Sequence, residues 1–409
     1  MGEQHPRLRQ VEIFPIQHNG QRLLCLRDPF HFTDNVVTVS IAAIPILQRL
    51  DGAHSLPEIQ AEMLRTTQQT VPLAQLQGFV DRLDEALMLA SSRFHKHHDE
   101  LVRKFRESSV RAAAHAGGSY PQDPAEITRM FSQHTDAPKG PGTNGTNQAD
   151  IPAAIVSPHI DLRRGGPAFA WAYQQLAHAS NVDTFIILGV AHAPTKNRFA
   201  GTLKHYQTPF GSATTDVGLM KKLAGMLSFD LFEDEFVHRS EHSIEFQVVY
   251  LQHSLRERRK FQIAPILIGS FHDLVHSGRE PVKDPQVASF CRALRQTLSD
   301  SSKKICVIAG VDLAHVGGRF GDEFTVNKEV LAQIETDDRE MLKILENCDP
   351  ARFFRMIQKE QDCRRICGFP TLYTMLSSLD VKQGRLLCYD QSYEKNTNSV
   401  VSFASMSFS

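Results

Sequence analysis

Residues 184–192, Thr-Phe-Ile-Ile-Leu-Gly-Val-Ala-His, form an almost unbroken apolar run that ends on a histidine. Two further apolar runs begin near residues 151 and 304 and also end on a histidine. The three closing histidines are His159, His192 and His315. Such runs are typical of parallel strands that are buried on both faces. The carboxyl ends of these strands meet at one edge of an open α/β sheet, where ligands bind. We therefore expect the three imidazoles to share that edge and to form a metal site.

Strands and helices are predicted to alternate from residue 152 onward. The predicted strands cover 152–158, 184–190, 262–269, 304–311, 384–393 and 399–408. The predicted helices cover 167–179, 216–227, 241–256, 284–298, 338–347, 351–359 and 370–379, with Gly165 and Gly166 in the turn before the first of them. This alternation is typical of an α/β fold. We expect a central, mostly parallel sheet with helices on both faces.

A small α+β domain is predicted before this sheet, over residues 1–95. The pattern of apolar residues predicts a hairpin with strands at 11–16 and 22–26, and then helices over 36–50, 55–66 and 72–89. Ser55 and Glu58 form a capping-box pattern at the start of the second helix. A hairpin with three short helices is similar to a winged-helix domain.

The remaining organisation follows from charge and composition. A charged, histidine-rich segment predicts an exposed linker helix over 96–111, and the α/β domain then covers 112–409. Residues 135–150 combine Pro, Gly, Asn and Thr and contain no apolar residue larger than alanine, which predicts a flexible surface insertion. A length of 409 residues also favours two domains over one.

The overall composition excludes several classes of protein. The 45 Lys and Arg residues nearly balance the 46 Asp and Glu residues, so neither nucleic acid nor a membrane surface is an expected partner. The polar N-terminus does not resemble a signal peptide, and no segment approaches the roughly 20 apolar residues of a membrane span. Seven cysteines, an odd number without a CxxC pair, indicate reduced thiols. We therefore expect a cytoplasmic protein.

Residues outside the three runs could complete a site. His242 and Glu245 lie three residues apart on a predicted helix and so share one face, as an acid/base pair or as a metal ligand with its orienting group. The structural alternative is that Glu241 and Glu245 only stabilise the helix N-terminus. Cys367 precedes a predicted helix, where a thiol can act as a ligand or nucleophile, although buried cysteines are often inert packing.

Asp161 lies two residues after His159, so the two side chains would point the same way if this segment stays extended. The carboxylate would then be a ligand or would support the histidine from the second coordination sphere. Several common motifs are absent from the sequence: GxGxxG, Walker A, HExxH and GxSxG. Their absence argues against the usual nucleotide-binding, zincin and serine-hydrolase classes.

Eight motifs occur in order between residues 112 and 376. They are AAAHAGGSYP (112–121), SPHIDLRRGG (157–166), FIILGVAHAP (185–194), TPFGSATTD (208–216), EHSIEFQVVYLQ (241–252), PILIGSF (265–271), GVDLAHVGGRFGD (310–322) and ICGFPTLYTML (366–376). Through these motifs the chain resembles the Memo family, whose bacterial and archaeal members are called protein B of the AmmeMemoRadiSam system. The resemblance covers about residues 110–409.

This resemblance implies a fold similar to class III extradiol dioxygenases, the LigB-like non-haem iron enzymes. It implies a divalent metal, Fe(II) first and Cu or Zn as alternatives, and a redox or oxygenase-like activity. The implied metal ligands are His159, His192 and His315, and the implied catalytic residues are His242, Glu245, Asp312 and Cys367. His115 matches a His-Ala-Gly segment near the start of the family domain.

Residues 36–63, VVTVSIAAIPILQRLDGAHSLPEIQAEM, are similar to PqqD-like domains, which bind leader peptides or partners in radical-SAM modification systems. The resemblance implies a recognition role for the N-terminal domain, with a structural appendage as the alternative. The expected partners are a small-molecule or peptide substrate, a radical-SAM enzyme and AMMECR-type proteins.

Two departures from the family pattern affect the expected site. The usual Pro-His-Ala-Gly-Tyr is Pro-His-Ile-Asp-Leu here, which places the Asp161 carboxylate close to the expected metal. Val-Gly-Gly follows His315 in place of an aromatic residue, which would open the pocket. A three-histidine set also differs from the two-His-one-carboxylate set of extradiol dioxygenases. Noncatalytic metal binding and zinc-dependent hydrolysis therefore stand as alternatives to redox chemistry.

Overall fold

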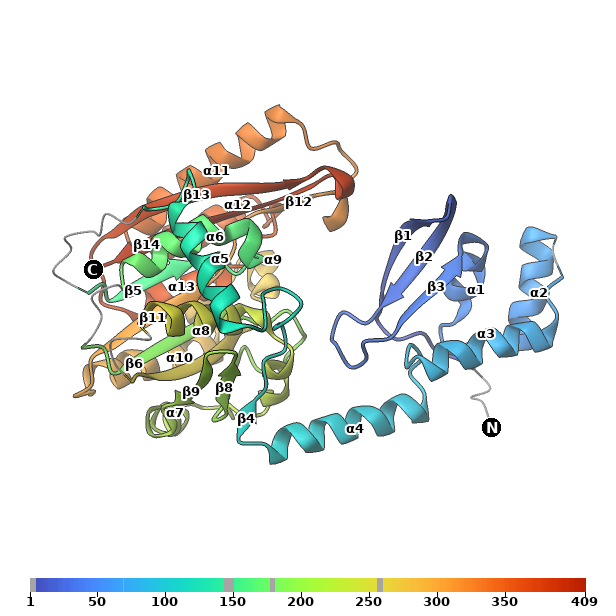
Figure 1. The fold of residues 1–409 in the computed structure, drawn as a ribbon, viewed down its shortest axis with the longest axis horizontal. Coiled ribbons are helices and arrows are strands. Elements are labelled where there is room, and N and C mark those ends of the chain that lie inside the picture. The colour runs from blue at the N-terminus through green and yellow to red at the C-terminus, as the bar shows by residue number, and fades with distance from the viewer. Residues whose placement is uncertain (1–4, 69, 143–150, 177–180, 256–259) are drawn as a thin grey trace. The chain divides into compact units, whose positions relative to one another are not determined.

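The computed structural model describes residues 5–68, 70–142, 151–176, 181–255 and 260–409. The chain divides into two units, Met1–Glu107 and Ser108–Ser409 (Figure 1). Each unit has hydrophobic core residues of its own, so the two are described in turn. Among the described residues, no helix is long and apolar enough to cross a membrane.

The first unit contains a small antiparallel sheet followed by helices. Its strands are β1 (Glu12–His18), β2 (Gln21–Arg27) and β3 (Val36–Ser40). Its α-helices are α1 (Ile44–Arg49), α2 (Leu56–Thr67), α3 (Leu73–Glu85) and α4 (Ser92–Glu107). The predicted hairpin is confirmed as β1 and β2, and the predicted capping box at the start of α2 is present.

The helix predicted over 36–50 is wrong in its first part, where β3 forms instead. This strand pairs with β2, from Val36 opposite Arg27 to Ser40 opposite Leu23. Three valines and a threonine make up most of β3, and their β-branched side chains favour an extended backbone. Helical structure begins after Ser40, whose hydroxyl accepts a hydrogen bond from the backbone N–H of Ala42.

The second unit is built on an eleven-stranded sheet. Nine strands follow the order β12-β14-β5-β11-β6-β10-β9-β8-β4, while β13 pairs with β14 and β7 pairs with β10. The strands are β4 (Val110–Arg111), β5 (Ala154–Ser157), β6 (Thr184–Val190), β7 (Phe199–Gly201), β8 (His205–Thr208), β9 (Gly211–Thr215), β10 (Gln262–Ile268), β11 (Ile305–Gly310), β12 (His315–Gly317), β13 (Gly384–Glu394) and β14 (Ser399–Phe408).

The centre of this sheet is parallel and much of its periphery is antiparallel. β5, β11, β6 and β10 run parallel to one another, as predicted from their apolar runs. The pairs β13–β14 and β8–β9 are antiparallel, and β14 also pairs antiparallel with β5. The sheet is therefore mixed, and the expectation of a mostly parallel sheet holds only for its centre.

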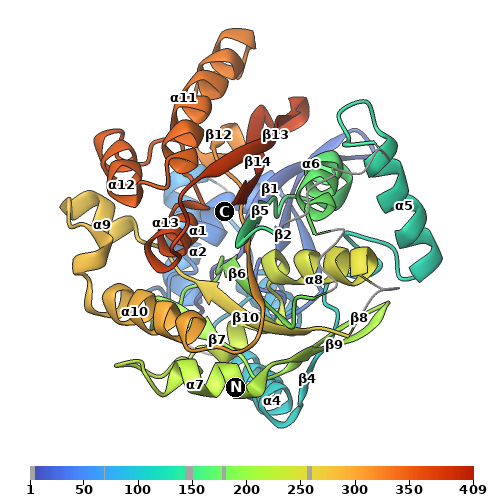
Figure 2. The ribbon, with the colours of Figure 1, turned by 90° about the vertical axis from the view of Figure 1, so that its left-hand side faces the viewer.

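Helices cover both faces of the sheet (Figure 2). One layer contains α5 (Pro124–Asp136), α6 (Leu162–Gln174) and α8 (His242–Leu255). The other contains α7 (Val217–Ala224), α9 (His272–Ser277), α10 (Pro285–Ser299), α11 (Lys328–Glu346), α12 (Pro350–Lys359) and α13 (Phe369–Ser378). In β6, Phe185 and Ile187 pack in the hydrophobic core under the layer that contains α8, whereas Ile186 and Leu188 pack in the core under the other layer. Successive side chains in a strand point to opposite faces of the sheet.

One local prediction is wrong, and another falls partly outside the described residues. α6 contains Gly165 and Gly166, which were predicted to lie in a turn before it. Both glycines are needed for packing, because a Cβ at Gly165 would lie 2.5 Å from Ile160 and one at Gly166 would lie 2.3 Å from His134. The insertion predicted at 135–150 begins at the end of α5, and its residues 143–150 lie outside the described part of the chain.

Candidate metal centre

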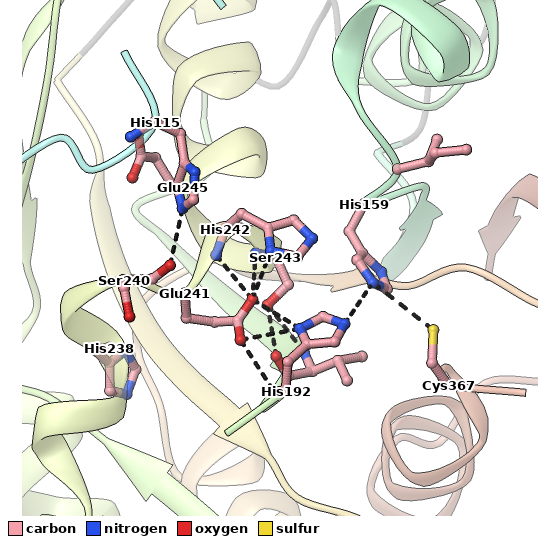
Figure 3. Close-up of polar contacts among 12 residues, drawn as sticks. His115, His159, His192, His238, Ser240, Glu241, His242, Ser243, Glu245 and Cys367 are labelled. Atoms are coloured by element: carbon pink, nitrogen blue, oxygen red, sulfur yellow. Dashed lines mark hydrogen bonds and ion pairs between the residues drawn. The ribbon is translucent and has the colours of Figure 1, made fainter. Parts of the chain in front are cut away.

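Three histidines meet beyond the carboxyl ends of the central strands (Figure 3). His159 follows β5, His192 follows β6 and His242 is the first residue of α8. One nitrogen from each ring lies within 4.8 Å of the other two, and the Nε2 atoms of His159 and His192 are 3.3 Å apart. This cluster can hold a metal ion.

The spacing of these nitrogens fits a shared ion. Two imidazole nitrogens bound tetrahedrally at about 2.0–2.1 Å from a metal lie about 3.4 Å from each other. The Nδ1 atom of His159 is buried and has no hydrogen-bond partner in the described part of the chain, so the polar contacts of this ring are made through Nε2. The donor set therefore fits a divalent transition metal.

Burial and neighbouring charge set the protonation of the rings. Burial lowers the pKa of His159 well below its usual value, and the neighbouring His192 and His242 lower it further. Burial would also lower the pKa of His192, but the adjacent Glu241 carboxylate outweighs burial and raises it. Without a metal, His192 is therefore the more readily protonated of these two rings.

The Glu241 carboxylate holds the residues of the cluster in position through hydrogen bonds. Its carboxylate accepts hydrogen bonds from His192 Nδ1 at 3.0 Å and from the backbone N–H groups of His192, His242 and Ser243. Burial would raise the pKa of Glu241, but His192 and His242 lower it well below its usual value, so the carboxylate is ionised. Since Nδ1 of His192 carries the hydrogen, its Nε2 can present a lone pair towards His159.

Cys367 and Asp312 lie beside His159. The Cys367 sulfur is 3.8 Å from His159 Nε2 and 3.6 Å from the Asp312 carbonyl oxygen. Asp312 Oδ1 accepts hydrogen bonds from the backbone N–H groups of His159, at 3.0 Å, and Ile160, at 3.1 Å. Burial raises the pKa of the Cys367 thiol well above its usual value and raises that of Asp312 to about 7.

His315 lies near this cluster but outside the group of three. The apolar run that precedes it does not remain one strand, because β11 ends at Gly310 and His315 begins β12, which pairs with β14. The His315 Nδ1 atom is 3.0 Å from the Leu313 carbonyl oxygen. Its ring meets Phe320 edge-on at 5.2 Å, so an aromatic side chain covers it although Val-Gly-Gly follows directly.

Glu245 is held at a separate, fully buried ion pair. Its carboxylate pairs with Arg111 and accepts hydrogen bonds from Tyr120 Oη at 2.5 Å and from the backbone N–H groups of Ala114 and His115, both at 3.0 Å. Arg111 also donates to the carbonyl oxygen of Glu241 at 2.7 Å. These contacts fasten the chain around residues 111–120 to α8, and they occupy the carboxylate that was expected to move protons.

Two other predicted residues serve local structure. Asp161 caps α6, where its carboxylate accepts a hydrogen bond from the Arg163 N–H at 2.9 Å, because the chain turns into a helix instead of staying extended. The His115 Nε2 atom lies 2.9 Å from the Ser240 carbonyl oxygen, and its ring is 5.8 Å from that of His242. His115 thus packs behind the cluster.

Glu241 orients His192, a role that the sequence did not predict. Glu241 was considered only for its charge at a helix N-terminus, and it does accept hydrogen bonds from the first N–H groups of α8. Its hydrogen bond to His192 forms only because the fold brings β6 and α8 together, and no pattern within a short segment of sequence predicts that contact. The one local signal is a glutamate directly before a helix that begins with histidine.

Two cavities reach His192. The larger, of about 810 Å³, lies between residues 191–198 and the start of α10. The smaller, of about 250 Å³, extends past Cys367 to α9. Pockets for small ligands usually measure about 300–1,000 Å³, so the larger cavity has the size for a small molecule or a short peptide segment.

Glu241→Gln is expected to weaken metal binding by about 10–100-fold, because the neutral amide no longer supports His192 as a ligand. Zinc affinity is measured by competition with a chromophoric chelator. Glu235→Gln is the matched control, since this nearby carboxylate accepts a hydrogen bond from Thr202 away from the cluster. Equal zinc affinity in the Glu241 variant and the wild type would contradict the orienting role.

Glu245→Gln is expected to lower the free energy of unfolding by about 3–5 kcal/mol, because it leaves the Arg111 guanidinium buried without its counter-ion. Urea denaturation measures the loss. The double variant Arg111→Met/Glu245→Leu removes both charges and should be more stable than Glu245→Gln. A Glu245→Gln variant as stable as the wild type would refute the structural role.

Comparison with known proteins identifies the family. The model of the Memo-like protein family matches residues 111–407. A MEMO1 family protein of Aquifex aeolicus (strain VF5) is 27% identical over 402 residues, which cover 98% of this chain and 99% of that protein. The MEMO1 family protein TTHA0924 of Thermus thermophilus is 25% identical, over 85% of this chain and 97% of its own length, and MK0963 of Methanopyrus kandleri is 27% identical, over 73% and 98%. Because the family model spans well over half of the sequence, the chain belongs to the Memo-like protein family.

Proposed function

We propose that this protein is a metal-dependent redox protein that binds Fe(II) at the His159–His192–His242 cluster. The observation that carries the proposal is the convergence of three imidazoles next to the Cys367 thiol, with the ionised Glu241 behind them. The resemblance to class III extradiol dioxygenases supports iron and an oxygenase-like reaction. Imidazole also suits copper and zinc, which are the alternative metals.

In this proposal the chain's own groups position the substrate and handle protons. When bound, Fe(II) supplies redox chemistry and coordination positions that the protein leaves open. Asp312 is buried and its pKa is about 7, so its carboxyl can hold or release a proton near neutral pH. Cys367 lies close enough to His159 to join the ligands once its thiol is deprotonated. The larger cavity receives a small molecule or a peptide segment at His192.

Metal analysis of protein purified without oxygen, followed by oxygen-uptake assays, tests this proposal. We expect one equivalent of iron at this cluster and oxygen consumption, and both are expected to be lost in His159→Ala/His192→Ala/His242→Ala. His315→Ala is the matched control, since this histidine lies outside the group of three, and it should keep most of the iron. Zinc without oxygen uptake would instead support a hydrolase, and bound metal without any turnover would support a noncatalytic protein. Unchanged metal content in the triple variant would refute the site.

We also propose that the first unit recruits a protein partner, such as a radical-SAM enzyme, or a peptide substrate, in a cytoplasmic setting. Large exposed apolar side chains are concentrated in this unit: Ile13, Phe14, Val36, Ile41, Ile44, Leu64 and Leu73 are each at least 36% exposed. Exposed apolar surface of this kind often marks an interaction site. Val36 is the most exposed of them, at 54%, and it lies on the edge strand β3.

Val36→Lys is expected to weaken binding of a radical-SAM enzyme encoded nearby in the genome, because a charged lysine on an edge strand opposes further strand pairing. Val282→Lys, the same substitution at an exposed valine of the second unit, is the matched control. Isothermal titration calorimetry with the purified enzyme measures both affinities. Binding that survives Val36→Lys unchanged would remove β3 from the recruitment surface.

A further inference from the structure

A second pair of histidines lies on α9, which borders the smaller cavity. His272 and His276 are one helical turn apart, and both are exposed. Their Nε2 atoms are 2.8 Å apart and their ring centroids are 4.1 Å apart. Two histidines four residues apart on one helix face form a bidentate donor for divalent transition metals.

Gln361 orients this pair. The Gln361 side-chain nitrogen donates to the Gln358 carbonyl oxygen at 2.7 Å, so its Oε1 atom faces His276 Nδ1 at 3.1 Å. Because Oε1 only accepts hydrogen bonds, Nδ1 of neutral His276 carries the hydrogen and Nε2 presents a lone pair towards His272. Support of this kind, from an acceptor on the far side of the ring, is characteristic of metal-binding histidines.

The smaller cavity connects the pair to the inner cluster. His272 lines this cavity of about 250 Å³ together with Asp362, Cys367 and His192. Its wall thus offers imidazole, carboxylate and thiol groups, which are the usual protein ligands of transition metals. An ion bound at His272 would meet potential ligands along the way to His192.

We propose that His272 and His276 form a second metal site, which takes up a divalent transition-metal ion and supplies it to the inner cluster. On binding, His272 shifts its proton from Nε2 to Nδ1, so that both Nε2 atoms donate a lone pair to the ion. The ion then moves inward by ligand exchange and keeps its charge, so no oxidant or reductant is required. Only the delivery step rests on the proposed function, because the outer site binds metal by itself.

Zinc titration of full-length, metal-free protein tests the outer site. The wild type is expected to bind two zinc equivalents by calorimetry, and both His272→Ala/His276→Ala and His159→Ala/His192→Ala are expected to bind one. The variant with all four substitutions should bind none. Gln361→Ala should weaken the outer site by about tenfold or more, whereas His95→Ala, at an exposed histidine of α4, should leave both sites intact.

The outcomes separate the outer site from the inner one. If the protein without His159 and His192 keeps one equivalent that the four-residue variant loses, the outer site stands even where the proposed function fails. If His272→Ala/His276→Ala still binds two equivalents, the outer site is refuted. Delivery is tested by stopped-flow with limiting zinc: the inner cluster of His272→Ala/His276→Ala should fill more slowly, to the same final occupancy. An unchanged filling rate would refute delivery.

Discussion

The cluster depends on one buried carboxylate, that of Glu241. Its hydrogen bonds join the end of β6 to the start of α8, since it accepts from the backbone of His192 on one side and from that of His242 on the other. The same carboxylate also accepts from the His192 ring. The position of two rings and the tautomer of one therefore follow from a single ionised group. An ionised carboxylate in such a place is stable only because several donors satisfy it.

The second buried ion pair reinforces this arrangement. Arg111 bonds to the Glu245 carboxylate and to the carbonyl oxygens of His238 and Glu241, so it fixes the backbone on both sides of the turn that leads into α8. Buried ion pairs contribute little net stability compared with apolar residues, but they are costly to break. Here the pair determines where the chain enters α8, and thus where His242 lies.

The parallel strands and their polar ends could be predicted from local pattern, because a buried parallel strand has a distinct composition. His159 and His192 were correctly expected beside each other for this reason. His315 was expected with them, but β11 ends at Gly310, so Asp312 lies next to His159 while His315 passes into β12. The part played by Glu241 depends on contacts between distant segments, which composition and spacing do not encode. The wrong helix over 36–50 has a related cause. The spacing of its apolar residues resembles that of a helix, but the β-branched residues of β3 favour an extended backbone, and Val36, Ile41 and Ile44 are exposed.

The order of strands in the sheet also determines when the second unit can form during synthesis. β5 lies between β11 and β14, and both of these strands come much later in the sequence than β5. Until those strands leave the ribosome, the wholly buried residues of β5 have no neighbours to pair with. Pairing between distant segments is slow, and unpaired apolar strands promote aggregation. The apolar residues of β5 are therefore unprotected until segments far away in the sequence have been synthesised and can pair with them.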